Sequence, residues 1–64
     1  MHYLAQFFEY RQLPKEQMET GQFFAVLAGK ILELPDNPER TTSLRKLLEA
    51  RDCALRALVY KVTE

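Results

Sequence analysis

The sequence predicts an all-α protein in which two long helices form an antiparallel hairpin after a short N-terminal aromatic segment, the hairpins assembling into an oligomer. Three observations carry this prediction. Two long stretches place apolar residues at helical spacing, prolines stand at the boundaries between segments, and the turn joining the two stretches is short. Helices joined by so short a turn must be antiparallel neighbours. The 64 residues leave room for a single domain, 1–64.

The first helix is expected over about 15–33. Pro14 is favoured at a helix start, and acidic residues follow in the opening turns, where the helix dipole prefers them. One face collects Thr20, Phe24, Leu27, Ala28 and Ile31. Phe23 and Val26 extend the apolar surface around the side, so this helix should have more than one neighbour. Gly21 is interpreted as a tolerated weak point, the alternative being close approach by another helix or a ligand.

The second helix is expected over about 38–61. It follows the turn Leu34-Pro35-Asp36-Asn37-Pro38, in which Asn37 is a good N-cap and Pro38 a good first helical residue. Its apolar line is Leu44, Leu47, Leu48, Leu55 and Leu58.

The N-terminal segment, 1–13, is dense in aromatic residues. Tyr3, Leu4, Phe7 and Phe8 would form one stripe if the segment were helical. The segment could equally be an extended arm lying across a partner, and the sequence leaves both possibilities open.

Oligomerisation is predicted from the burial that such a small chain needs. Ordering 64 residues costs about 1.5 kcal/mol per residue, which requires burial of about 4,000 Å² of apolar surface. A two-helix hairpin alone cannot reach that area. Cys53 is the only cysteine and His2 the only histidine, so neither a disulfide nor a metal cluster can supply the difference. Assembly of several copies remains.

Composition also excludes several classes of partner. Nine basic and nine acidic residues give a net charge of zero, which argues against DNA or RNA polymers and against a basic membrane-surface helix. No apolar run approaches the ~20 residues of a membrane span. The stretch MHYLAQFF lacks the features of a signal peptide, and with the free cysteine this predicts a reducing cytoplasm.

The sequence offers few residues that could catalyse a reaction, and neither an enzyme nor a cofactor is expected. The informative residues are basic ones in unusual places. Arg51 falls within the apolar line of the second helix, where its guanidinium needs an anion or a carboxylate across an oligomer interface. Arg40, Thr41 and Thr42 lie in the first turns of that helix and make a candidate phosphate site. Arg40 is expected to reach solvent, so that its removal would hardly change stability.

Three further residues, Tyr10, Arg11 and Lys46, complete the candidate ligand site. Tyr10, next to Arg11, is the aromatic residue best placed to stack on a nucleobase. Lys46 would supply additional positive charge. Phe7 and Phe8 are expected to serve in packing.

The second half of the chain resembles the phage anti-CBASS sponge proteins, whose helical hairpin also occurs in Thoeris anti-defence sponges. The resemblance lies in residues 34–41, LPDNPERT, and in residues 44–50, LRKLLEA, followed by Ala54 and Ala57. In that family a proline-containing turn with a basic residue leads into a helix reading roughly leucine, threonine, lysine, leucine, glutamate, glutamate, alanine. Arg45 replaces the threonine here, and Lys46, Leu47, Glu49 and Ala50 match.

This resemblance implies binding without chemistry. Such proteins sequester cyclic oligonucleotide immune second messengers without cleaving them and so block bacterial anti-phage signalling. It implies a cyclic dinucleotide or trinucleotide ligand, a homo-oligomer from dimer to hexamer, and a location in the cytoplasm of an infected bacterial host. The alternative is a small structural or protein-binding helical adaptor with no small-molecule ligand.

Overall fold

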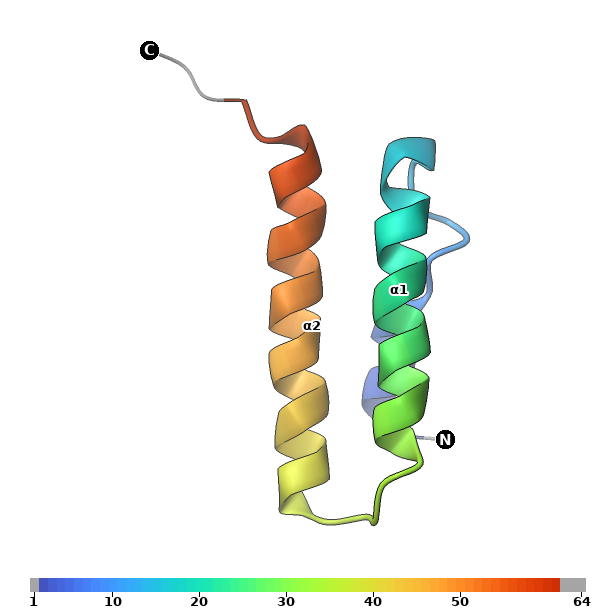
Figure 1. Cartoon of the computed structure of the whole chain (residues 1–64), viewed down its shortest axis with the longest axis vertical. Coiled ribbons are helices and arrows are strands. Elements are labelled where there is room, and N and C mark those ends of the chain that lie inside the picture. Colours follow the sequence, from blue (N-terminus) through green and yellow to red (C-terminus); the bar gives the residue numbers. More distant parts are fainter. Residues whose placement is uncertain (1, 62–64) are drawn as a thin grey trace.

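The computed structural model describes residues 2–61 and contains three helical elements. They are the 3₁₀ helix η1 (Tyr3–Phe8) and the α-helices α1 (Lys15–Leu32) and α2 (Pro38–Val59). The two long helices run antiparallel and pack side by side (Figure 1). The described part of the chain has no strand, so the prediction of an all-helical chain with two packed long helices is confirmed.

Prolines set both ends of helix α1. Pro14 precedes it in an extended conformation, and the Pro14 carbonyl accepts the first helical bond from the Gln17 N–H at 2.8 Å. At the other end the Glu33 and Leu34 N–H groups donate to carbonyls one turn back. Leu34 precedes Pro35, which disfavours helical backbone at Leu34 and ends the helix.

Helix α2 is capped by Asn37. This residue is extended, and its side-chain oxygen accepts a hydrogen bond from the Arg40 N–H at 2.9 Å. Pro38 follows as the first helical residue, where its missing N–H has no cost. The helix ends at Val59, two residues before the expected end, because Tyr60 adopts an extended conformation.

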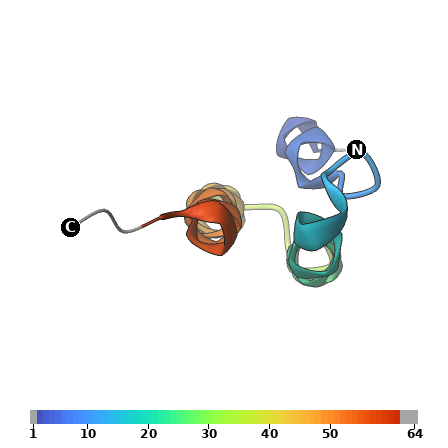
Figure 2. The ribbon, with the colours of Figure 1, turned by 90° about the horizontal axis from the view of Figure 1, so that it is seen from above.

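Part of the N-terminal segment, Tyr3–Phe8, is helical and packs on its own chain. Seen along the helix axes, η1 lies beside α1 on one side of the hairpin (Figure 2). Leu4 and Phe8 are buried at 7% and 3% exposure, whereas Tyr3 and Phe7 are at least half exposed. The stripe expected for a helix is therefore split: Leu4 and Phe8 face the core, and Tyr3 and Phe7 face water.

The core lies where these three elements meet. Its buried members are Leu4, Phe8, Ala28 and Leu44, and the residues packed around them are Phe24, Ala25, Ile31, Leu32, Leu47 and Leu48. Leu44 is completely buried. Farther along the hairpin, the Gln17 side chain of α1 donates to the Leu55 carbonyl of α2 at 2.9 Å. One chain thus buries more than a bare hairpin would.

Gly21 is a point of close approach. A Cβ atom built on Gly21 would lie 2.5 Å from Leu13 Cδ1 and 3.1 Å from Tyr10 Cβ. The interpretation of Gly21 as a tolerated weak point therefore gives way to the close-approach alternative. The approaching group is the chain's own segment 10–13, not another helix or a ligand.

The small residues Gly21 and Ala28 face inward, and this rotates part of the expected apolar face of α1 outward. Leu27, expected to pack, is 48% exposed, next to Phe23 at 68% and Val26 at 57%. On α2, Leu58 was also expected to pack and is 50% exposed. No helix within residues 2–61 is both long and apolar enough to cross a membrane.

Candidate functional site

The residues predicted to bind a ligand fall into three groups on this structure. Arg40, Thr41 and Thr42 lie at the start of α2. Tyr10, Arg11 and Arg51 surround Glu9, in the segment that links η1 to α1. Lys46 lies alone on the exposed side of α2.

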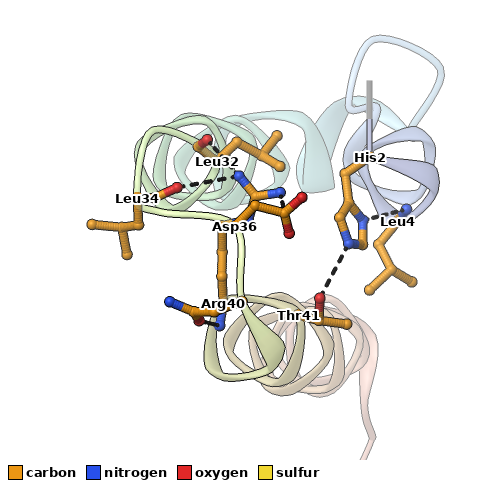
Figure 3. Close-up of polar contacts among 8 residues, drawn as sticks. His2, Leu4, Leu32, Leu34, Asp36, Arg40 and Thr41 are labelled. Atoms are coloured by element: carbon orange, nitrogen blue, oxygen red, sulfur yellow. Dashed lines mark hydrogen bonds and ion pairs between the residues drawn. The ribbon is translucent and has the colours of Figure 1, made fainter.

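The Arg40 side chain hydrogen-bonds within the turn between α1 and α2, contrary to the expectation that it reaches solvent. Its side chain is only 13% exposed. Its Nη1 donates to the carbonyls of Leu32 and Leu34 at 3.1 and 3.2 Å, and its Nη2 lies 3.1 Å from an Asp36 carboxylate oxygen (Figure 3). Carbonyls at a helix C-terminus have no partner within the helix, so Arg40 caps α1 from the first turn of α2. The guanidinium is not open to a phosphate in this conformation.

The two threonines beside Arg40 differ in surroundings. Thr41 Oγ1 lies 3.5 Å from His2 Nε2, and the other ring nitrogen, Nδ1, accepts from the Leu4 N–H at 3.1 Å (Figure 3). Because Nδ1 accepts, a neutral His2 ring carries its proton on Nε2 and can donate it to Thr41. His2 therefore links η1 to α2, a role that the sequence did not suggest. Thr42 is exposed.

Arg51 is buried against the N-terminal segment and not at a surface. It is 9% exposed, its Nη2 donates to the Glu9 carbonyl at 3.0 Å, and its Nη1 lies 3.2 Å from Asp52. The expected need for a partner at this apolar position is thus met within the chain, by the Glu9 carbonyl and the Asp52 carboxylate. The Nε atoms of both Arg40 and Arg51 are buried without a hydrogen-bond partner among the described residues.

Glu9 organises the link between η1 and α1. Its carboxylate accepts hydrogen bonds from the Tyr10 and Arg11 N–H groups at 3.0 and 2.8 Å, and from Arg11 Nη1 at 3.4 Å. The Arg11 backbone hydrogen bond is the main cause that lowers the pKa of this carboxyl below its usual range. Sequence reasoning missed Glu9, since the turn that aligns two consecutive N–H groups has no clear signature.

An open groove lies between the N-terminal segment and α1. It has a volume of about 410 Å³ and is lined by Ala5, Gln6, Phe8, Glu9, Tyr10, Arg11, Ala25, Ala28, Gly29 and Leu32. Its floor is apolar and its rim carries Gln6, Glu9 and Arg11. The Arg11 guanidinium carbon lies 5.4 Å from the centre of the Tyr10 ring, within cation–π distance. Among the predicted site residues, this groove brings Tyr10 and Arg11 together.

Lys46 lies outside that groove. Its side chain is 74% exposed and its ammonium group lies 3.5 Å from Glu49. The ion pairs on this part of α2 join Lys46 with Glu49 and Arg51 with Asp52. Lys46 and Glu49 are three residues apart and meet through helical spacing, whereas Arg51 and Asp52 are adjacent in the chain.

The groups at these sites offer an aromatic ring, charged side chains and apolar contacts. Within residues 2–61 no three histidine, cysteine or acidic side chains gather as a metal site would require. The groove combines an apolar floor with a few polar rim groups, the usual character of a small-molecule site. No protein-family model, curated protein or solved structure matches this chain, so its function is inferred from the geometry described above and from the sequence.

Proposed function

We propose that this chain is a non-enzymatic binding protein that sequesters a cyclic dinucleotide or trinucleotide without cleaving it and acts as a homo-oligomer. The observation that supports it most is the groove between the N-terminal segment and α1, where Tyr10 and Arg11 meet above an apolar floor. The sequence resemblance of residues 34–50 to cyclic-nucleotide sponges supports the same ligand class.

The groove suits a nucleotide in size and in chemistry. Small-molecule sites typically enclose about 300–1,000 Å³, and this groove holds about 410 Å³. An aromatic ring such as that of Tyr10 stacks on nucleobases without requiring one particular base. Arg11 is 73% exposed and its contact with Glu9 is a long one at 3.4 Å, so a phosphate can compete for it.

The proposal changes the roles assigned to the other basic residues. Arg40 and Arg51 bind backbone carbonyls and serve the fold, so the anion contacts pass to Arg11. Lys46 is not among the groove's lining residues and would reach the same ligand only from a second copy.

A panel of cyclic dinucleotides and trinucleotides in thermal-shift and calorimetric titrations tests the proposal. A ligand at 100 times Kd should stabilise the fold by about 2.7 kcal/mol. Arg11→Ala should then weaken binding by about tenfold to a hundredfold through loss of a charge-assisted contact. Gly29→Leu should also weaken binding, because a Cβ on Gly29 meets no atom within 4 Å and a larger side chain would extend into the groove.

Arg45→Ala is the matched control, since Arg45 is an exposed arginine on α2 outside the groove. Equal losses for Arg11→Ala and Arg45→Ala would contradict the groove as the site. Silence across the whole panel would contradict the ligand class.

A helical adaptor that binds a protein is the second candidate function. The exposure of Phe23, Val26 and Leu27 on one side of α1 favours it, because large apolar residues gathered on a surface commonly mark a protein contact. A chain that is silent to cyclic nucleotides and assembles with a different protein through α1 would fit this second function.

A further inference from the structure

The outer side of α1 carries a seam with coiled-coil spacing. Glu19, Phe23, Val26 and Lys30 follow one another at intervals of four, three and four residues, which places them on one line along the helix. Phe23 is 68% and Val26 57% exposed, and the Lys30 side chain is 74% exposed. Within the chain, the three elements therefore leave the two central apolar residues of this seam largely in contact with water.

We infer that this seam packs antiparallel against the same seam of a second copy. In that arrangement Phe23 meets the second copy's Val26, and Glu19 lies opposite the second copy's Lys30. Twofold symmetry repeats each contact. A parallel arrangement would instead place Glu19 against Glu19 and Lys30 against Lys30. The order acid, apolar, apolar, base is complementary to itself only when the two helices run in opposite directions.

The charges at the ends of the seam are available for this contact. Among the described residues Lys30 pairs only with Glu33, at 3.9 Å and with both side chains at least 70% exposed. Such an exposed pair contributes little and can rearrange. The next pair outward would be Glu16 with the second copy's Glu33, which is of like charge. Favourable pairing is therefore confined to the segment from Glu19 to Lys30.

The surface area also fits a second copy. The chain exposes 5048 Å², whereas a compact monomer of its mass exposes about 4,250 Å². The chain is thus less compact than a typical monomer, which leaves surface for a second copy to cover. Net charge is zero, so no overall repulsion opposes the association of identical chains.

The inference rests on the proposed homo-oligomer and specifies the surface that forms it. The groove residues of α1 lie on other sides of the helix from the seam at 3.6 residues per turn; they are Ala25, Ala28, Gly29 and Leu32. Assembly through the seam therefore leaves the groove open, and ligand binding and association can be measured independently.

Charge reversal with complementary mixing tests the pairing directly. Glu19→Lys alone and Lys30→Glu alone each put like charges opposite one another twice. Each should weaken self-association by about tenfold in sedimentation equilibrium. An equimolar mixture of the two variants has complementary charges at both ends and should form a heterodimer about as tight as the wild-type dimer. If a single variant fails to fold by itself, the mixture should recover its helical circular dichroism.

Lys46→Glu is the matched control, because Lys46 is also 74% exposed and is likewise paired with a glutamate three residues on. It should leave association unchanged. A wild-type monomer, a charge-reversed variant that associates like the wild type, or a mixture that forms no heterodimer would each overturn the inference. Wild-type assembly through this seam without cyclic-nucleotide binding would uphold the inference and reject only the proposed ligand.

Discussion

At the scale of single residues, two arginines that the sequence suggests as anion contacts, Arg40 and Arg51, bind backbone carbonyls of their own chain. Arg40 donates hydrogen bonds to carbonyls at the C-terminus of α1, and Arg51 donates one to the Glu9 carbonyl. Both guanidinium groups donate to backbone carbonyls. Carbonyls at the end of a helix have no partner within the helix and otherwise bond to water or to capping residues. The sequence identified Arg51 as needing a partner. It could not identify a backbone carbonyl 42 residues away as that partner.

Removing Arg40 should destabilise the fold, contrary to what its place in the sequence suggests. Arg40→Ala leaves the Leu32 and Leu34 carbonyls without this donor, and hydrogen bonds from charged groups contribute about 1.5–3 kcal/mol. Urea unfolding should therefore show a loss in that range. Arg45→Ala, an exposed arginine five residues on, should change the free energy of unfolding by less than about 0.5 kcal/mol. Equal effects would mean that Arg40 does not cap α1.

Glu9 should make stability sensitive to acid. Its pKa in the folded chain lies below the ordinary value of 4.5, mainly because of the Arg11 backbone hydrogen bond. The ionised form therefore stabilises the fold above the unfolded pKa. That contribution is lost as pH falls through the lower, folded pKa. The difference in stability between wild type and Glu9→Gln should be largest near neutral pH and should vanish in strong acid.

Arg11→Ala provides the comparison for that measurement. It removes the guanidinium but keeps the Arg11 N–H that bonds Glu9. Most of the acid sensitivity should therefore remain in Arg11→Ala and disappear in Glu9→Gln. Loss of the sensitivity in both variants would assign the lowered pKa to charge, not to the backbone hydrogen bond.

At the scale of elements, the helix boundaries could be predicted because residues at the ends determine them. Pro14, Asn37 and Pro38 act locally, and α1 and α2 begin at the positions these residues indicate. The rotation of α1 could not be predicted in the same way. It depends on which small residues, Gly21 and Ala28, the other elements approach.

The two glycines of α1 offer a matched pair of substitutions. Gly29→Ala should raise the free energy of unfolding by about 0.5–1 kcal/mol, because alanine favours helix and nothing lies within 4 Å of the added Cβ. Gly21→Ala has the same intrinsic gain but must displace Leu13 and press on Tyr10. We expect Gly21→Ala to be less stable than Gly29→Ala by at least about 1 kcal/mol in chemical unfolding. Equal stabilisation would show that segment 10–13 does not pack on α1.

Two neighbouring phenylalanines test whether η1 belongs to the core. Phe8 is 3% exposed and Phe7 is 50% exposed. Phe8→Ala should cost about 3–5 kcal/mol, as for other fully buried aromatic residues. Phe7→Ala should cost far less. Similar melting temperatures for the two variants would indicate an N-terminal arm that lies elsewhere.

At the scale of the whole molecule, the chain is a flat, elongated body of 45 × 24 × 15 Å with a small core. Packing of η1 supplies part of the apolar burial that the hairpin lacks. The sequence left open whether this segment is a helix or an extended arm. Large apolar residues nevertheless remain exposed on α1 and near the end of α2. One copy therefore buries only part of the apolar surface that a chain of this length needs to bury. The remainder, which stays exposed, supports the proposed assembly.

That remainder predicts a melting temperature that depends on protein concentration. If folding and dimerisation are coupled, a tenfold dilution costs about 1.4 kcal/mol per dimer, or about 0.7 kcal/mol per chain. For a domain of this size the melting temperature should then fall by about 3–6 °C for each tenfold dilution. Calorimetry between 10 and 1,000 times the dissociation constant measures this slope. Phe23→Ala, which shortens the side chain at the centre of the seam, should lower the melting temperature at every concentration. Phe23 is 68% exposed in one chain, so removing its ring reduces apolar burial only in the assembly. A melting temperature that stays constant on dilution would mean that the three elements of one chain suffice for folding.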